Sequence, residues 1–209
     1  MMKHSIIPII ICMLALSVPP SEATLITIEI TAEVDSVRDE ANYLDGQINP
    51  GDIITGTYIY ESTTPDSSPS DPVQGNYWNY APPAGISLTV GGFNFTTDSS
   101  NVVFCVFIRN DNISGDDIYG INSRNNLPLS NGTLVDYIRW QLNDHTASAL
   151  SSDALPTTAP ILGQWQANDL RLETDRAFLI HAHVTSAIPE PATILLFALG
   201  ALFLRKRSN

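Results

Sequence analysis

The segment at residues 25–35 alternates strictly between apolar and polar side chains. Its apolar members occupy every second position: Ile26, Ile28, Ile30, Ala32 and Val34. A period of two places successive side chains on opposite faces of an extended chain. A strand of this kind needs a sheet with one buried face, so the segment predicts antiparallel β-structure.

Further short segments rich in apolar and β-branched residues follow along the chain. They lie at residues 53–60, 86–90, 93–95, 102–109, 118–121, 134–142, 169–173 and 177–184. Gly91-Gly92 separates two of them and indicates a tight hairpin, because glycine admits the positive φ of primed turns. About eight short strands without a long helical pattern predict an all-β domain, an antiparallel β-sandwich or jelly roll.

Two long connections separate the predicted strands, at residues 61–83 and 145–163. The first begins with a polar, proline-rich stretch at residues 64–72, which predicts a surface loop. Its aromatic continuation, Tyr77-Trp78-Asn79-Tyr80, is expected to fold back and cover an open edge of the sheet.

The first 23 residues have the features of an export signal. Lys3 and His4 precede an apolar segment at residues 6–16, and small residues stand before a predicted cleavage point between Ala23 and Thr24. Signal peptidase is therefore an expected partner, and the mature chain is expected outside the cytoplasm.

The C-terminus has three parts. Pro189-Glu190-Pro191 is followed by an uncharged segment at residues 192–204 and then by the cluster Arg205-Lys206-Arg207. As a helix the segment extends about 20 Å, less than the ~30 Å of hydrocarbon in a bilayer, so flanking side chains have to reach the interface. The cluster is expected to stay in the cytoplasm, which leaves the body outside.

These three parts resemble the PEP-CTERM sorting signal found on exported proteins of Gram-negative bacteria. The resemblance implies recognition by exosortase, a membrane transpeptidase-like enzyme that removes the tail near the Pro-Glu-Pro motif. It also implies transient anchoring in the inner membrane, followed by release or transfer to the cell surface. The expected organisation is a signal peptide at 1–23, a β body at 24–187 and a sorting signal, with a transmembrane helix, at 188–209.

The body between the two ends is strongly acidic. Residues 24–188 contain six arginines, no lysine and 20 acidic residues, a net charge of −14, whereas the whole chain has −12. Such a body repels phosphate backbones, so nucleic acid is excluded as an expected partner.

Catalytic and zinc chemistry have little support in the sequence. Cys105 is the one cysteine left after export, and it lies within an apolar strand where a small buried hydrophobe is expected. His181 and His183 would share a strand face, and His145 would complete a zinc site. No carboxylate-histidine motif accompanies them, so an ordinary polar strand face is the favoured interpretation. No Gly-x-Ser-x-Gly elbow is present. The chain is therefore predicted not to be an enzyme.

A loop of hard oxygen ligands is the better metal candidate. Asp111, Asn112, Asp116 and Asp117 crowd beside Gly115 and suggest calcium. No other cofactor is expected. The loop departs from the EF-hand pattern, which requires a glutamate where this chain has isoleucine. The alternative is a turn whose Asn and Asp side chains bond to their own backbone.

Aromatic residues offer a further possibility, a stacking platform for sugar rings formed by Trp78 and Tyr77. The resulting hypothesis is a non-enzymatic structural or adhesive protein of the surface, extracellular matrix or biofilm, associated with extracellular polysaccharide. The alternatives are a glycan-active hydrolase and a calcium-dependent binding module on the same scaffold.

Overall fold

The computed structural model describes residues 23–112, 114–174 and 177–190. Within these ranges the chain forms ten strands, one 3-10 turn at Leu162–Gln164 and no α-helix. The strands are β1 (Leu25–Arg38), β2 (Ile53–Glu61), β3 (Gln74–Asn79), β4 (Gly85–Val90), β5 (Phe93–Thr96), β6 (Phe104–Arg109), β7 (Asp117–Ser123), β8 (Tyr137–Asp144), β9 (Ala167–Glu173) and β10 (Leu179–Pro189). The all-β prediction is confirmed.

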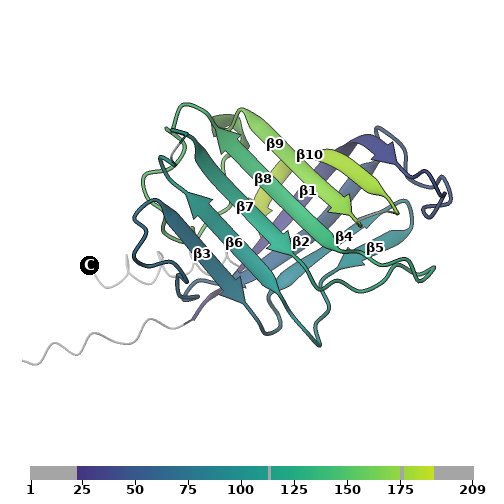
Figure 1. Ribbon diagram of the computed structural model, residues 1–209, viewed down its shortest axis with the longest axis horizontal. Helices are drawn as coiled ribbons and strands as arrows, with labels where there is room; N and C mark the ends of the chain where they lie inside the picture. The colour runs from purple at the N-terminus through teal and green to yellow at the C-terminus, as the bar shows by residue number, and fades with distance from the viewer. Residues whose placement is uncertain (1–22, 113, 175–176, 191–209) are drawn as a thin grey trace, which may run out of the picture.

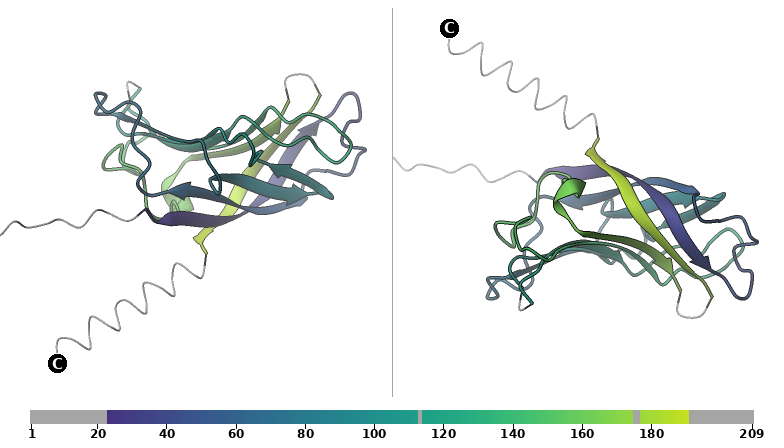
Figure 2. Two further views of the ribbon diagram at one scale, coloured as in Figure 1. Left: turned by 90° about the horizontal axis from the view of Figure 1, so that it is seen from below. Right: turned by 90° about the horizontal axis from the view of Figure 1, so that it is seen from above.

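All ten strands belong to one antiparallel sheet, in the order β3-β6-β7-β8-β9-β10-β1-β2-β4-β5 (Figure 1). The sheet curls, so that the half containing β6, β7 and β8 faces the half containing β1, β2 and β4 (Figure 2). The predicted arrangement as a sandwich or jelly roll is not confirmed, because hydrogen bonds connect the strands without interruption from β3 to β5. The strands also number ten instead of about eight.

Strands β1 and β10 lie at the middle of this order, where the sheet turns from one half to the other. Their pairing contains two register shifts, one between Thr31 and Ala32 and one between Val34 and Ser36. Such irregularities bend a strand pair and increase its twist. We infer that they help the sheet to curl.

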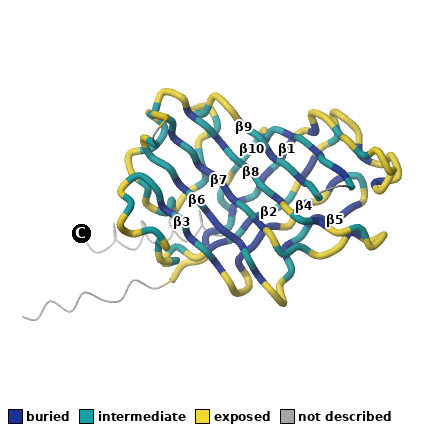
Figure 3. The backbone as a smooth tube through the Cα atoms, viewed as in Figure 1, coloured by how far each residue is buried: buried dark blue, intermediate teal, exposed yellow. Residues whose placement is uncertain are grey.

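The core lies between the two facing halves. The predicted inward side of β1 is confirmed, since all five of its alternating apolar residues are buried. Alternation of buried and more exposed residues is also clear in β3 and β8, whereas β6 and β7 each have three consecutive buried residues (Figure 3). Tyr58 of β2 meets β7 and β8 across the core: its hydroxyl lies 2.8 Å from that of Tyr119, and its ring lies 6.0 Å from that of Trp140. Core residues of the described chain run from Ile26 to Val184. The described strands run from Leu25 to Pro189, so residues 24–190 contain the entire described sheet.

Two local predictions are resolved by the strand pairing. Gly91 and Gly92 form the hairpin between β4 and β5, with φ of 56° and 80°. The aromatic segment near residue 78 does more than cover an edge, because it forms β3 and pairs with β6 as the edge strand itself.

The predicted signal peptide, residues 1–23, lies outside the described residues except for Ala23, and the predicted sorting helix, residues 192–204, lies outside them entirely. Within the described ranges, no helix has the length and apolar character needed to cross a bilayer. The first strand of the body starts beside the end of its last strand, because β1 and β10 are antiparallel neighbours (Figure 2).

Candidate functional site: the outer face of the sheet and the sorting end

The sorting motif begins inside the sheet. Ile188 and Pro189 are still paired with β1, opposite Glu29 and Ile28, and the Glu190 N–H donates to the carbonyl oxygen of Thr27 at 3.1 Å. Strand β10 therefore extends past the predicted body boundary at residue 187. The other predicted motif residues lie outside the described residues: Pro191, Arg205, Lys206 and Arg207.

The predicted signal cleavage point lies next to the same edge of the molecule. Ala23 is exposed, and Thr24 exchanges two hydrogen bonds with Ser62: its N–H donates to Ser62 Oγ at 3.1 Å, and its carbonyl accepts from the Ser62 N–H at 2.9 Å. Thr24 is thus already part of the folded body, and Ala23 is the first described residue before it.

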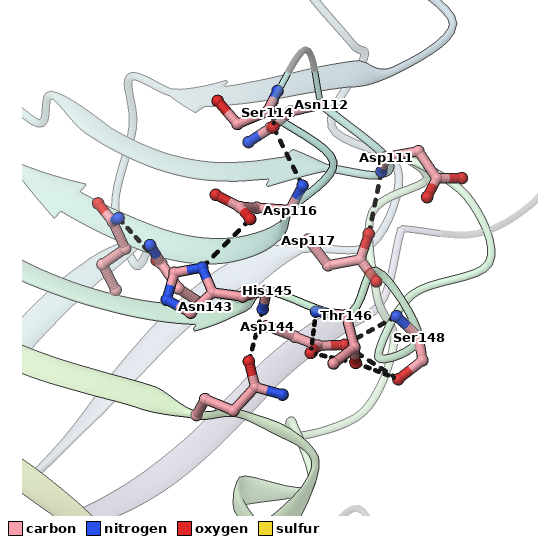
Figure 4. A network of polar contacts seen from close by, with 12 residues as sticks. Asp111, Asn112, Ser114, Asp116, Asp117, Asn143, Asp144, His145, Thr146 and Ser148 are labelled. Atoms are coloured by element: carbon pink, nitrogen blue, oxygen red, sulfur yellow. Dashed lines mark hydrogen bonds and ion pairs between the residues drawn. The ribbon is translucent and has the colours of Figure 1, made fainter.

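Two of the four residues proposed for calcium, Asn112 and Asp117, accept hydrogen bonds from backbone N–H groups, while Asp116 pairs with His145 (Figure 4). The buried Asp117 carboxylate accepts from the N–H groups of Asp111, at 2.9 Å, and Leu150, at 2.8 Å. Asn112 Oδ1 accepts from the N–H groups of Ser114 and Asp116. These are the bonds expected of a structural turn, the second interpretation of this loop.

The neighbouring loop after β8 is organised by Asp144, which the sequence did not single out. Its buried carboxylate accepts from the backbone N–H groups of Thr146, Ser148 and Ala149 and from two hydroxyls (Figure 4). These bonds, led by those from Thr146 and Ser148, hold the pKa of Asp144 well below its usual range. An Asp followed by Thr and Ser two and four positions later was the available signal.

The three histidines considered for zinc each meet a different aspartate. His145 pairs with Asp116 at 3.1 Å, His181 with Asp169 at 3.2 Å and His183 with Asp35 at 2.7 Å. In the part of the chain that the structure describes, no group of three or more His, Cys, Asp or Glu is arranged to hold a metal ion.

The outer face of β3, β6, β7 and β8 contains a groove with a volume of about 280 Å³. Its lining is mostly amide, aromatic and arginine side chains: Asn76, Trp78, Cys105, Phe107, Arg109, Asn122, Arg124, Arg139 and Gln141. Four of these residues stand in register across the four strands, in the order Trp78, Cys105, Asn122 and Arg139. We call this hollow the outer groove.

The two residues predicted for sugar stacking point to opposite sides of β3. Trp78 lines the outer groove, where it stacks on Tyr80 with 6.2 Å between ring centroids. Tyr77 is buried, and its hydroxyl donates to the Asp153 carbonyl, so its ring offers no face to a ligand. Alternation along the strand separates Tyr77 from Trp78, whereas Tyr80, beyond the end of the strand, is exposed.

The floor of the outer groove is formed by close packing across β6 and β7. The Phe107 ring lies over Gly120, where an added Cβ would come within 2.1 Å of it. Cys105 beside it is buried, as predicted, and burial raises the pKa of its thiol to about 11. The thiol is therefore neutral at pH 7 and a weak nucleophile.

A family model for the PEP-CTERM protein-sorting motif matches residues 187–208. The chain carries a PEP-CTERM sorting domain. The match confirms the resemblance seen in the Pro-Glu-Pro motif and its tail, and it supports export and processing by exosortase. No curated protein and no solved structure matches the chain. The match includes only the last residues of the sheet. The role of the body of this PEP-CTERM protein therefore has to be inferred from the geometry of the body itself.

Proposed function

We propose that this PEP-CTERM protein is a non-enzymatic, glycan-associated module of the cell surface or extracellular matrix. In this proposal signal peptidase cleaves after Ala23, and the C-terminal segment anchors the chain transiently in the inner membrane. Exosortase then processes the chain near Pro189-Glu190-Pro191. The family match supports the sorting route, and the outer groove supports the role of the body.

The observation that carries the glycan role is the position of Trp78. Its half-buried ring lines a groove of amide, arginine and aromatic side chains, stacked on the exposed Tyr80 and lying 5.3 Å from the Arg124 guanidinium. An aromatic ring offers an apolar face, and the amides of Asn76, Asn122 and Gln141 offer both donors and acceptors. Sugar rings, which combine C–H faces with hydroxyl groups, match both kinds of surface.

The lining of the outer groove favours binding over hydrolysis. Most glycosidases place two carboxylic acids on either side of the scissile bond, roughly 5–9.5 Å apart. The groove is lined by neither Asp nor Glu, and its cysteine is a neutral thiol. This composition supports a module that holds a glycan without cleaving it.

A glycan array with residues 24–190 tests the proposal, with Trp78→Ala as the variant. We expect the unmodified body to bind at least one polysaccharide and the variant to bind it roughly tenfold more weakly, because stacking area is lost. Tyr43→Ala is the matched control, since Tyr43 is an exposed aromatic residue outside the groove. Binding that is equal in all three proteins, or absent in all, contradicts the proposal.

A further inference from the structure

The outer groove concentrates positive charge on an acidic body. Three of the six arginines in residues 24–188 line it, namely Arg109, Arg124 and Arg139, although the body has 20 acidic residues. Charges farther than about 8 Å are largely screened at physiological salt. The three arginines lie within this distance of a ligand in the groove, and Asp169, which stands opposite Gln141 on β9 at the margin of the groove, is paired with Arg171.

These guanidinium groups are not neutralised by carboxylates. Arg109 Nε donates to the uncharged Gln74 Oε1 at 3.0 Å, and Arg124 lies 5.3 Å from the centre of the Trp78 ring. In the described part of the chain, none of the three groove arginines forms an ion pair. By contrast Arg171, which stands directly opposite Arg139 on β9, is paired with Asp169. The positive face thus ends where β9 begins.

The geometry of the row favours an extended ligand. Trp78 and Arg139 stand in register on β3 and β8, three strand spacings apart. At about 4.8 Å each, these spacings separate the two backbones by about 14 Å. The row thus presents side chains from four adjacent strands, and a chain of sugars lying across the strands contacts several of them at once.

The groove also contains an unmet acceptor between its two ends. Asn122 Oδ1 is covered and has no hydrogen-bond partner among the described residues. It stands between Cys105 and Arg139 in the row. Only a small shift of the surrounding side chains would open this acceptor to a donor such as a sugar hydroxyl, so the oxygen adds to the polar character of the groove without defining a contact.

We propose that the outer groove binds a polysaccharide that contains uronic acids. Trp78 stacks on a sugar ring, the amides bond to hydroxyls, and the arginines bind carboxylates, which suit the planar guanidinium fork. The proposal rests on the glycan-associated function given above and names its ligand class. Arginine and aromatic side chains also suit single-stranded nucleic acid, and the net charge of −14 opposes either polyanion. The amide side chains of the groove, which match sugar hydroxyls, favour the polysaccharide.

Matched acidic and neutral polymers test the carboxylate requirement. The probes are polygalacturonate, alginate and hyaluronan, each beside the same polymer with its carboxyl groups reduced to alcohols, and a single-stranded DNA. Residues 24–190 are titrated by calorimetry as the unmodified body, as Arg139→Gln and as Arg38→Gln. Arg38 is an exposed arginine outside the outer groove, so its variant has the same change in net charge.

We expect at least one acidic polymer to bind more tightly than its reduced form, with affinity that falls as salt rises. Arg139→Gln is expected to weaken this binding roughly tenfold or more, and Arg38→Gln less than about twofold. Unchanged melting curves exclude misfolding. Equal binding of acidic and reduced polymers overturns the uronic acid proposal and leaves the glycan role intact. Binding of no polymer overturns both the uronic acid proposal and the glycan role, and so does tighter binding of DNA than of any polysaccharide. If Arg139→Gln and Arg38→Gln weaken binding equally, the outer groove is not the binding site.

Discussion

The hydroxyl pair between Tyr58 and Tyr119 gives a direct test of the curled sheet. Strands β2 and β7 are far apart in the hydrogen-bonding order, and only curling brings these two fully buried hydroxyls to 2.8 Å. Tyr58→Phe or Tyr119→Phe leaves the other hydroxyl without this partner. A buried polar group that loses its hydrogen bond costs about 1–3 kcal/mol. For a domain of this size each single variant should lower Tm by about 2–12 °C.

The double variant distinguishes a direct hydrogen bond between the two hydroxyls from two independent effects of removing a polar group. Replacing both partners by apolar groups of the same shape is nearly neutral, so Tyr58→Phe with Tyr119→Phe should cost no more than the worse single variant. Urea unfolding of all four proteins gives the coupling energy, expected at about 1 kcal/mol or more. Tyr77→Phe combined with Tyr119→Phe is the control, since Tyr77 bonds to a separate backbone carbonyl. Additive losses for Tyr58 and Tyr119, within about 0.5 kcal/mol, would refute the contact and with it the curl.

Two further predictions concern processing and pH. Mass spectrometry of the exported protein from cells with exosortase should find residues 192–209 removed; a tail that remains attached would show that the motif does not direct cleavage. Tm should stay level from about pH 7 to about pH 10 and fall above it, because burial raises the pKa of Tyr77 to about 12 and also raises those of Tyr58 and Tyr119. The neutral folded forms stabilise the fold below the unfolded pKa of about 10, and this contribution is lost as pH rises toward 12. A level Tm through pH 11.5 would contradict this.

The sequence predicted strands well where alternation is strong and the turns are marked by glycine. The alternating residues of β1 and the hairpin at Gly91-Gly92 follow from local rules, and both are confirmed. Strand β3 was missed because it follows a polar loop and mixes glycine and asparagine with aromatics, so its pairing depends on β6, far along the chain. The curl was missed for a related reason: the register shifts between β1 and β10 arise from pairing across the whole sequence.

In the candidate site too, residues marked by their sequence neighbours were predicted, and residues brought together by strand pairing were not. Trp78 was identified from its polar neighbours, and the structure places it in the outer groove. Arg109, Arg124 and Arg139 were counted only as part of a net charge, because nothing local shows that β6, β7 and β8 bring them to one face. Tyr77 was paired with Trp78 in the prediction although a strand turns adjacent side chains to opposite faces.

The position of β10 has a mechanical consequence for a body tethered through its C-terminus. The strand lies between β9 and β1, with bonds to both neighbours, and its last bonded residue is Glu190 at the start of the tail. Antiparallel hydrogen bonds run perpendicular to the strands, so a pull along β10 loads many of them together in shear instead of opening them one by one. The point of attachment is therefore a central strand of the sheet, suited to carry tension between a surface and whatever the body holds.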